Sequence, residues 1–192
     1  MSRTLTMLSI WLLAAALFVG AGALRAVPAV VVPVMAGGLT LGVLGAWWVL
    51  PGFGAWMARL DIRALVLLHV TRFVGIWFLV LESQGRLPHT WAVGAGWGDI
   101  AVATLALGLG LLAHRLGTAR EPMLILWNVL GLADLLLVVA SAARIVVRTP
   151  YAMLPLRELP LGLLPTFLVP LLIASHVIML SRLTGRRSPA AS

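Results

Sequence analysis

The sequence predicts an all-α integral membrane protein, folded as a bundle of six transmembrane helices. Of its 192 residues, 61% are hydrophobic and only 10% are charged, and the mean hydropathy is +1.07. A soluble domain carries about 25% charged residues, whereas long uncharged apolar stretches are typical of membrane spans. The few charges lie mostly between such stretches. This pattern argues against a soluble enzyme, a disulfide scaffold and a disordered chain.

Apolar stretches of bilayer length follow one another along the chain, with no separator long enough to form a soluble domain. We expect one membrane domain, 1–192, with helices near 5–24, 29–50, 64–82, 92–113, 123–147 and 160–180. Gly, Pro and charged residues in the separators end these helices. Arg3 gives the first stretch some likeness to a secretory signal, but its apolar run exceeds the about 7–15 residues of a signal core. We therefore expect this helix to be retained.

The basic residues indicate an orientation. All 14 are Arg, against six acidic residues, and the net charge is +8. In a soluble chain this balance would indicate nucleic-acid binding, but at helix ends Arg determines topology, so no nucleic-acid partner is expected. An inside N-terminus gives eight inner Arg and four outer Arg, and the sequence predicts cytoplasmic N- and C-termini. The inner residues are Arg3, Arg59, Arg63, Arg115, Arg120, Arg182, Arg186 and Arg187, and the outer are Arg25, Arg86, Arg148 and Arg157.

Polar side chains within the predicted spans are the candidate functional residues, because a charge in hydrocarbon is costly and is normally paired in the bundle interior. At about 1.5 Å rise per residue, Arg72 and Asp134 lie near mid-membrane, close enough for an ion pair. Asp99 lies further out and extends this network. The alternative for Asp99 is the N-cap of a short fourth helix that begins late.

His69, Asn128 and His176 form a second group, about 7 Å from the inner end of their helices. His69 and Arg72 are three residues apart and share one helix face. Asn128 either hydrogen-bonds between helices or binds a ligand. The two His residues permit a different interpretation, in which they ligate a haem b iron or another metal.

The chemistry of the site stays open at this point. Arg72, Asp134, Asp99 and Asn128 either hold helices together or bind a small polar solute or a proton. The chain has no Cys, which removes thiolate metal sites and a Cys nucleophile, and no catalytic motif stands out, so the sequence favours a non-enzymatic role. We expect no cofactor, with haem b as the alternative.

Several short motifs carry a family resemblance across residues 70–135. They are Arg72-x-x-Gly75-x-x-Phe78, Gly85-x-Leu87-Pro88, Trp91-Ala92, Ala95-Gly96-Trp97-Gly98-Asp99-Ile100 and Trp127-Asn128-x-x-Gly131-x-Ala-Asp134. This pattern resembles a family of uncharacterised multi-pass proteins of the bacterial inner membrane. The resemblance implies that location and carries over no activity or site.

Three hypotheses about function follow. The first is transport or permeation of a small polar solute or proton through the Arg72 and Asp134 site. The second is a membrane redox protein that binds haem b or a metal through His69 and His176. The third is a structural or accessory membrane subunit. In each case the lipid bilayer is the expected partner, and the sequence identifies no protein partner.

Overall fold

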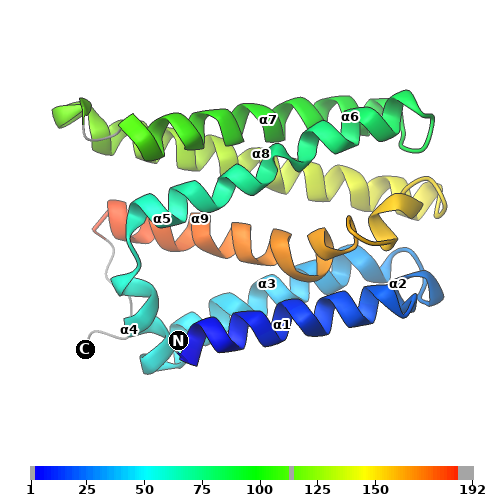
Figure 1. Ribbon diagram of the computed structural model, residues 1–192, viewed down its shortest axis with the longest axis horizontal. Helices are drawn as coiled ribbons and strands as arrows, with labels where there is room; N and C mark the ends of the chain where they lie inside the picture. Colours follow the sequence, from blue (N-terminus) through cyan, green and yellow to red (C-terminus); the bar gives the residue numbers. More distant parts are fainter. Residues whose placement is uncertain (1–2, 113–114, 186–192) are drawn as a thin grey trace.

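The helices run side by side along the long axis of the molecule and reverse direction at its two ends (Figure 1). The computed structural model describes residues 3–112 and 115–185, and every element within these ranges is helical. Helix α1 begins, and α9 ends, at the same end of the molecule. We call this the terminal end and the opposite one, where α2 lies, the α2 end.

The elements have the following bounds. The α-helices are α1 (Arg3–Gly20), α2 (Ala23–Ala26), α3 (Val31–Val49), α4 (Pro51–Arg59), α5 (Ile62–Leu68), α6 (Gly75–Ser83), α7 (His89–Leu112), α8 (Arg120–Arg148) and α9 (Val169–Leu183). Three 3₁₀ segments are η1 (His69–Val74), η3 (Gly117–Ala119) and η4 (Leu154–Arg157), and η5 (Leu164–Leu168) is a π-helix.

Five helical segments are long and apolar enough to cross a membrane. They are Val31–Val49, Ile62–Ser83, His89–Leu112, Gly117–Arg148 and Leu164–Leu183. The first predicted span is shorter than expected: its apolar helix runs over Leu5–Gly20, and Gly22 with φ 77° turns the chain before residue 24. The predicted start of the last span at residue 160 was also too early, because backbone turns occupy this stretch up to residue 162.

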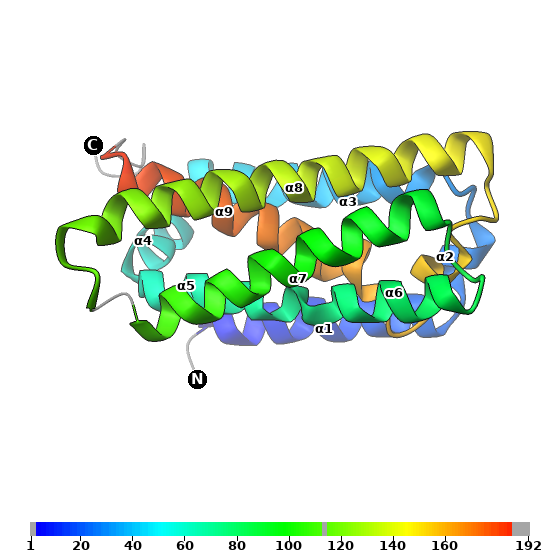
Figure 2. The same ribbon diagram turned by 90° about the horizontal axis from the view of Figure 1, so that it is seen from above.

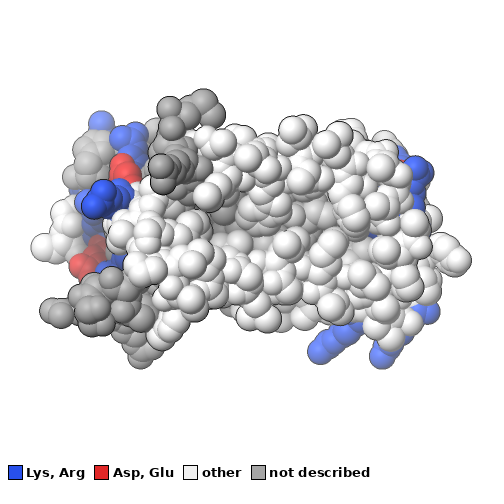
Figure 3. Space-filling model, turned by 90° about the horizontal axis from the view of Figure 1, so that it is seen from below, with Lys and Arg blue, Asp and Glu red and all other residues white. Residues whose placement is uncertain are grey.

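Charged side chains gather at the two ends of the molecule. Figure 3 shows Arg side chains at both ends of one face, acidic side chains plainly visible at the left end, and an uncharged band between the two ends. Large apolar side chains are exposed on the long helices, among them Leu17, Leu41, Trp97, Leu130 and Leu137. An apolar belt between charged ends suggests a protein embedded in a membrane.

Helix α9 occupies the centre of the bundle. It packs against α3, α5 and α8, while α7 packs against α5, η1, α6 and α8 (Figures 1 and 2). Apolar clusters fill the interior at both ends of this arrangement. Phe78, Trp91 and Met153 belong to a cluster nearer the α2 end, and Leu65 and Trp127 to one nearer the terminal end. A layer of buried polar residues lies between them.

The run of chain from α5 to α6 changes from an α-helix to a 3₁₀ helix and back to an α-helix. Helices α5 and α6 are joined by the 3₁₀ segment η1, in which side chains three residues apart stand almost directly above one another. His69 and Arg72 are such a pair, so both project from one face into the bundle. The tighter winding therefore aligns the two side chains that define the polar layer.

Arg157 ties the two loops of the α2 end together. Its Nε donates to the Leu24 carbonyl at 2.8 Å, and its Nη2 donates to the carbonyls of Arg25, at 3.0 Å, and Val27. These carbonyls lie at the C-terminus of α2, where a cation is favourable. The segment that precedes α9 thereby holds the connection between α1 and α3.

Gly75 is placed where helices α6 and α7 touch backbone to backbone. A Cβ there would lie 2.5 Å from the Gly96 carbonyl oxygen and 2.8 Å from the Asp99 Cβ. We expect Gly75→Ala to destabilise the protein by about 1–3 kcal/mol, because overpacking forces the helices apart. Thermal unfolding in detergent measures this. Gly94→Ala is the matched control, since nothing lies within 4 Å of its added Cβ, and an equal loss in both variants would contradict the packing argument.

Candidate functional site

Arg72 is the centre of the polar layer. Its Nε donates to Asp99 Oδ1 at 2.6 Å, its Nη1 to the Gly131 carbonyl at 2.9 Å, and its Nη2 to Asp134 Oδ2. One guanidinium thus joins three passes of the chain, through α7, α8 and its own segment η1. The side chain is 1% exposed. The ion pair between Arg72 and Asp134 forms as the sequence predicts.

Asp99 lies within α7 and not at its start. The helix begins ten residues earlier, at His89, so the alternative of Asp99 as an N-cap is wrong. Its carboxylate bonds Arg72 directly, although the predicted depth placed Asp99 further out. The long Arg72 side chain spans the difference in depth between the two helix positions and so reaches Asp99.

Small residues make room for this cluster. Gly98 faces Asp134, and any Cβ on Gly98 would collide with that carboxylate. Gly131 faces His176, and a Cβ on Gly131 would lie 2.8 Å from Cε1 of His176. Because Gly131 also accepts the bond from Arg72, its backbone separates the cluster from the His residues by one peptide.

The charges of the cluster do not balance. One Arg faces two carboxylates, and Asp99 is buried while the Asp134 side chain is 27% exposed. Asp99 Oδ2 accepts no hydrogen bond from any residue that the structure describes. Full ionisation of the three groups would leave one negative charge in an apolar interior, where it is costly.

His69 and His176 lie together, as predicted from their depth. Their ring centroids are 4.0 Å apart, and both rings contact Trp127. His69 Nε2 hydrogen-bonds to Ser175 Oγ at 3.0 Å, and His176 Nδ1 to Asn128 Oδ1. Asn128 Nδ2 also donates to the His176 carbonyl at 3.1 Å, so Asn128 positions the ring.

One nitrogen of each imidazole has no partner. His69 Nδ1 and His176 Nε2 are fully buried, and neither is hydrogen-bonded to a described residue. Buried polar atoms are normally satisfied, and such exceptions often mark functional sites. The two rings therefore provide two free proton-binding atoms next to the Arg72 cluster.

The His pair does not fit a haem. Since a metal–imidazole bond is about 2 Å long, two rings on opposite sides of one iron have centroids about 6 Å apart, with the macrocycle between them. Here the centroids are only 4.0 Å apart, so no macrocycle fits between the rings. Within the described residues no three His, Asp or Glu side chains gather as metal ligands.

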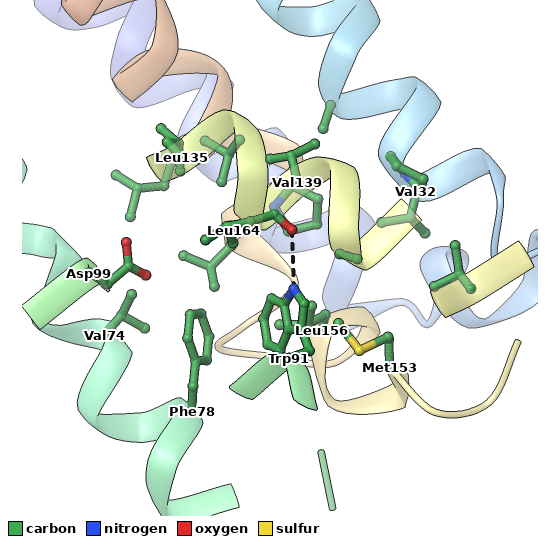
Figure 4. Close-up of a pocket in the computed structure, with 18 of the residues that line it drawn as sticks. Val32, Val74, Phe78, Trp91, Asp99, Leu135, Val139, Met153, Leu156 and Leu164 are labelled. Atoms are coloured by element: carbon green, nitrogen blue, oxygen red, sulfur yellow. Dashed lines mark hydrogen bonds between the residues drawn. The ribbon is translucent and has the colours of Figure 1, made fainter. Parts of the chain in front are cut away.

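Two hollows approach the polar layer from opposite ends. The first, of about 90 Å³, lies towards the α2 end, and Arg72, Asp99 and Arg157 are the charged residues in its otherwise apolar wall. Figure 4 shows the Asp99 carboxylate facing the space between Val74 and Leu135. The second is a groove of about 620 Å³ between α1, α3, α4, α5 and α9, and Ser175 lines it.

Sequence reasoning missed four parts of this site. They are Ser175, the Gly131 carbonyl, Arg157 and the two hollows. The available signal for Ser175 was its position directly before His176, which the sequence singles out as a candidate site residue. A backbone acceptor and a cavity have no signature in one sequence, because they depend on how side chains from distant segments fill space.

The helical arrangement and the buried polar layer define a class, that of multi-helix proteins with a polar site inside an apolar bundle. Residues 29–184 match the family described as a domain of unknown function, DUF8737, and the chain belongs to that family. The match begins before α3 and includes every residue of the Arg72 cluster and the His pair. No curated protein and no solved structure matches the chain.

Replacing Arg72 should destabilise the protein by breaking the Arg72 cluster. We expect Arg72→Met to destabilise the protein by about 3–5 kcal/mol, because it leaves the buried Asp99 and the partly exposed Asp134 without a cation. The double substitution Arg72→Met with Asp99→Asn should recover part of this loss. Thermal unfolding and the folded yield in detergent measure both effects. Arg86→Met, at an exposed position, is the control, and equal stability of Arg72→Met and Arg86→Met would contradict the ion-pair argument.

Proposed function

We propose that the protein is an integral protein of the bacterial cytoplasmic membrane, with six transmembrane helices and both termini in the cytoplasm. The five long apolar segments and the apolar belt between charged ends (Figure 3) support membrane embedding. Helix α1 runs along the other helices (Figure 1), which supports a sixth span. The excess of Arg in the predicted inner loops and tails, eight against four, supports the orientation.

Within this membrane protein, the Arg72 cluster binds and releases a proton as part of transport. The observation that carries this proposal is the unmatched charge of one Arg between two carboxylates, of which Asp99 is buried and Asp134 is partly exposed. A proton on one carboxyl neutralises the cluster, and its loss restores the charge. Intramembrane carboxylates that face the interior of a bundle are typical of proton pathways.

The His pair extends the proposed pathway towards the terminal end. Ser175 lines the groove on that side and hydrogen-bonds to His69, and His69 stacks on His176. His176 lies against Gly131, whose carbonyl binds Arg72. Asp99 then faces the hollow on the α2 side. Ionisable or hydroxyl groups thus lie between the two hollows.

A proton suits this layer better than a larger solute. The Gly75, Gly98 and Gly131 contacts leave no space for even one added Cβ, so a solute would have to separate the helices. A proton moves between fixed side chains with small shifts of hydrogen bonds. Tight packing therefore favours proton movement as the transport step.

The structural or accessory role has its own support. Arg72 links η1, α7 and α8 by three hydrogen bonds, which is how a polar residue holds helices together in a membrane. In that role the carboxylates matter for folding alone. The experiment must therefore separate folded yield from flux.

Proton flux should depend on both carboxylates. Purified protein in liposomes with a pH-sensitive dye inside is exposed to an imposed potential, and the wild type should admit protons. Asp99→Asn and Asp134→Asn should each lower the rate by at least about tenfold, since a positioned proton-transfer group contributes on the order of 10²–10⁴ in rate. His69→Gln and His176→Gln should also lower it.

The control for flux is Glu121→Gln, which changes an exposed carboxylate at the start of α8. It should conduct like the wild type. Rates are divided by the amount of folded protein recovered from the liposomes. If the two Asp variants fold in equal amount and conduct like the wild type, proton transport is refuted, and loss of folded protein with an unchanged rate per molecule supports the structural role.

A further inference from the structure

We propose that the hollow towards the α2 end is a binding site for a small lipophilic organic cation, such as a primary alkylammonium ion, whose head contacts Asp99. The inference rests on the proposed function, because the cation would take the place of the proton on Asp99. It adds the class of ligand that competes with the proton for Asp99.

The wall of the hollow selects an apolar body. Apart from Arg72, Asp99 and Arg157 it consists of apolar side chains, including Phe78, Trp91, Leu135, Val139 and Leu164 (Figure 4). The indole N–H of Trp91 donates to the Val138 carbonyl at 3.1 Å, so its ring is fixed and offers apolar surface. A strongly hydrated solute would lose its water here without replacement.

The free carboxylate oxygen selects the head group. Asp99 is 4% exposed, yet its Oδ2 accepts no hydrogen bond from the described residues, and the carboxylate faces the hollow (Figure 4). The cluster carries one negative charge in excess when it is ionised. An ammonium head supplies both the missing donor and the missing charge.

Arg157 sets the direction of the ligand. It is the cation at the opposite end of the hollow, held by three carbonyls, and Asp99 lies ten residues along α7 from its start, at a depth of about 15 Å. A cationic head is repelled at Arg157, whereas at Asp99 the two carboxylates of the ionised cluster outweigh the charge of Arg72. The ligand would therefore lie with its ammonium group deepest and its apolar end towards the α2 end.

The volume limits the ligand to a few heavy atoms. The hollow measures about 90 Å³, and a cavity of about 150 Å³ accommodates benzene. A four-carbon chain with one nitrogen is a suitable probe. Butylammonium, butan-1-ol and butyrate have similar size and differ in the charge of the head.

Calorimetric titration of these three probes into the detergent-solubilised protein tests the inference at neutral pH, where a primary amine is protonated. The wild type should bind butylammonium at least about tenfold more tightly than butan-1-ol or butyrate, because a hydrogen bond to a charged partner is stronger than a neutral one. Asp99→Asn should remove this preference.

A second pair of variants tests the hollow without changing the ion pair between Arg72 and Asp99. Ala142→Leu fills the hollow from α8 and should abolish binding of butylammonium and butan-1-ol, whereas Ala101→Leu, on the exposed face of α7, should bind like the wild type. The inference is overturned if butan-1-ol binds as tightly as butylammonium, if Ala142→Leu still binds, or if the wild type binds neither.

Proton flux of the wild type is measured alongside. Flux without butylammonium binding refutes the cation site and leaves the proposed function intact. Binding with the stated preference but without flux supports the cation site and refutes the proton pathway.

Discussion

The rest of the structure depends on the need to surround one buried guanidinium with acceptors in an apolar interior. Arg72 meets this need with two carboxylates and a backbone carbonyl from three passes of the chain. The requirement explains the 3₁₀ winding at η1, which aims His69 and Arg72 from one face. It also explains why glycine stands at 75, 98 and 131, since any larger residue would hold the neighbouring helices too far apart for these bonds.

The same bonds that hold the helices together also leave the cluster with an excess carboxylate. A pure structural lock needs one acid for one base, and a second carboxylate in an apolar interior adds a cost that stability alone does not repay. One nitrogen each of His69 and His176, which bonds no residue that the structure describes, adds a comparable cost one peptide away. Both costs lie in one layer, between a hollow on one side and a groove on the other, which supports a functional interpretation of the layer.

Much of this layer is predictable from the sequence, because apolar runs fix helix positions and the rise per residue fixes depth. The pairing of Arg72 with Asp134, and the meeting of His69, Asn128 and His176, follow from that arithmetic. The depth of a residue along its helix does not show how far the Arg72 side chain extends. For that reason Asp99 was expected further out, although the two residues are bonded directly. The length of α1 was also overestimated, because apolar residues continue past Gly22 although the backbone turns there. Ser175 and the hollows depend on side chains from distant segments.

The attachments of the N-terminal helix have a consequence for biosynthesis. The Trp11 indole donates to the Thr166 carbonyl in the π-helix, and Arg157 holds the carbonyls that follow α1. Both partners are synthesised more than a hundred residues after the groups they bind. During translation α1 emerges before the other described helices, yet it gains these attachments only after η4 and η5 are made. The groove that α1 borders is therefore completed last, after the Arg72 cluster has all of its ligands.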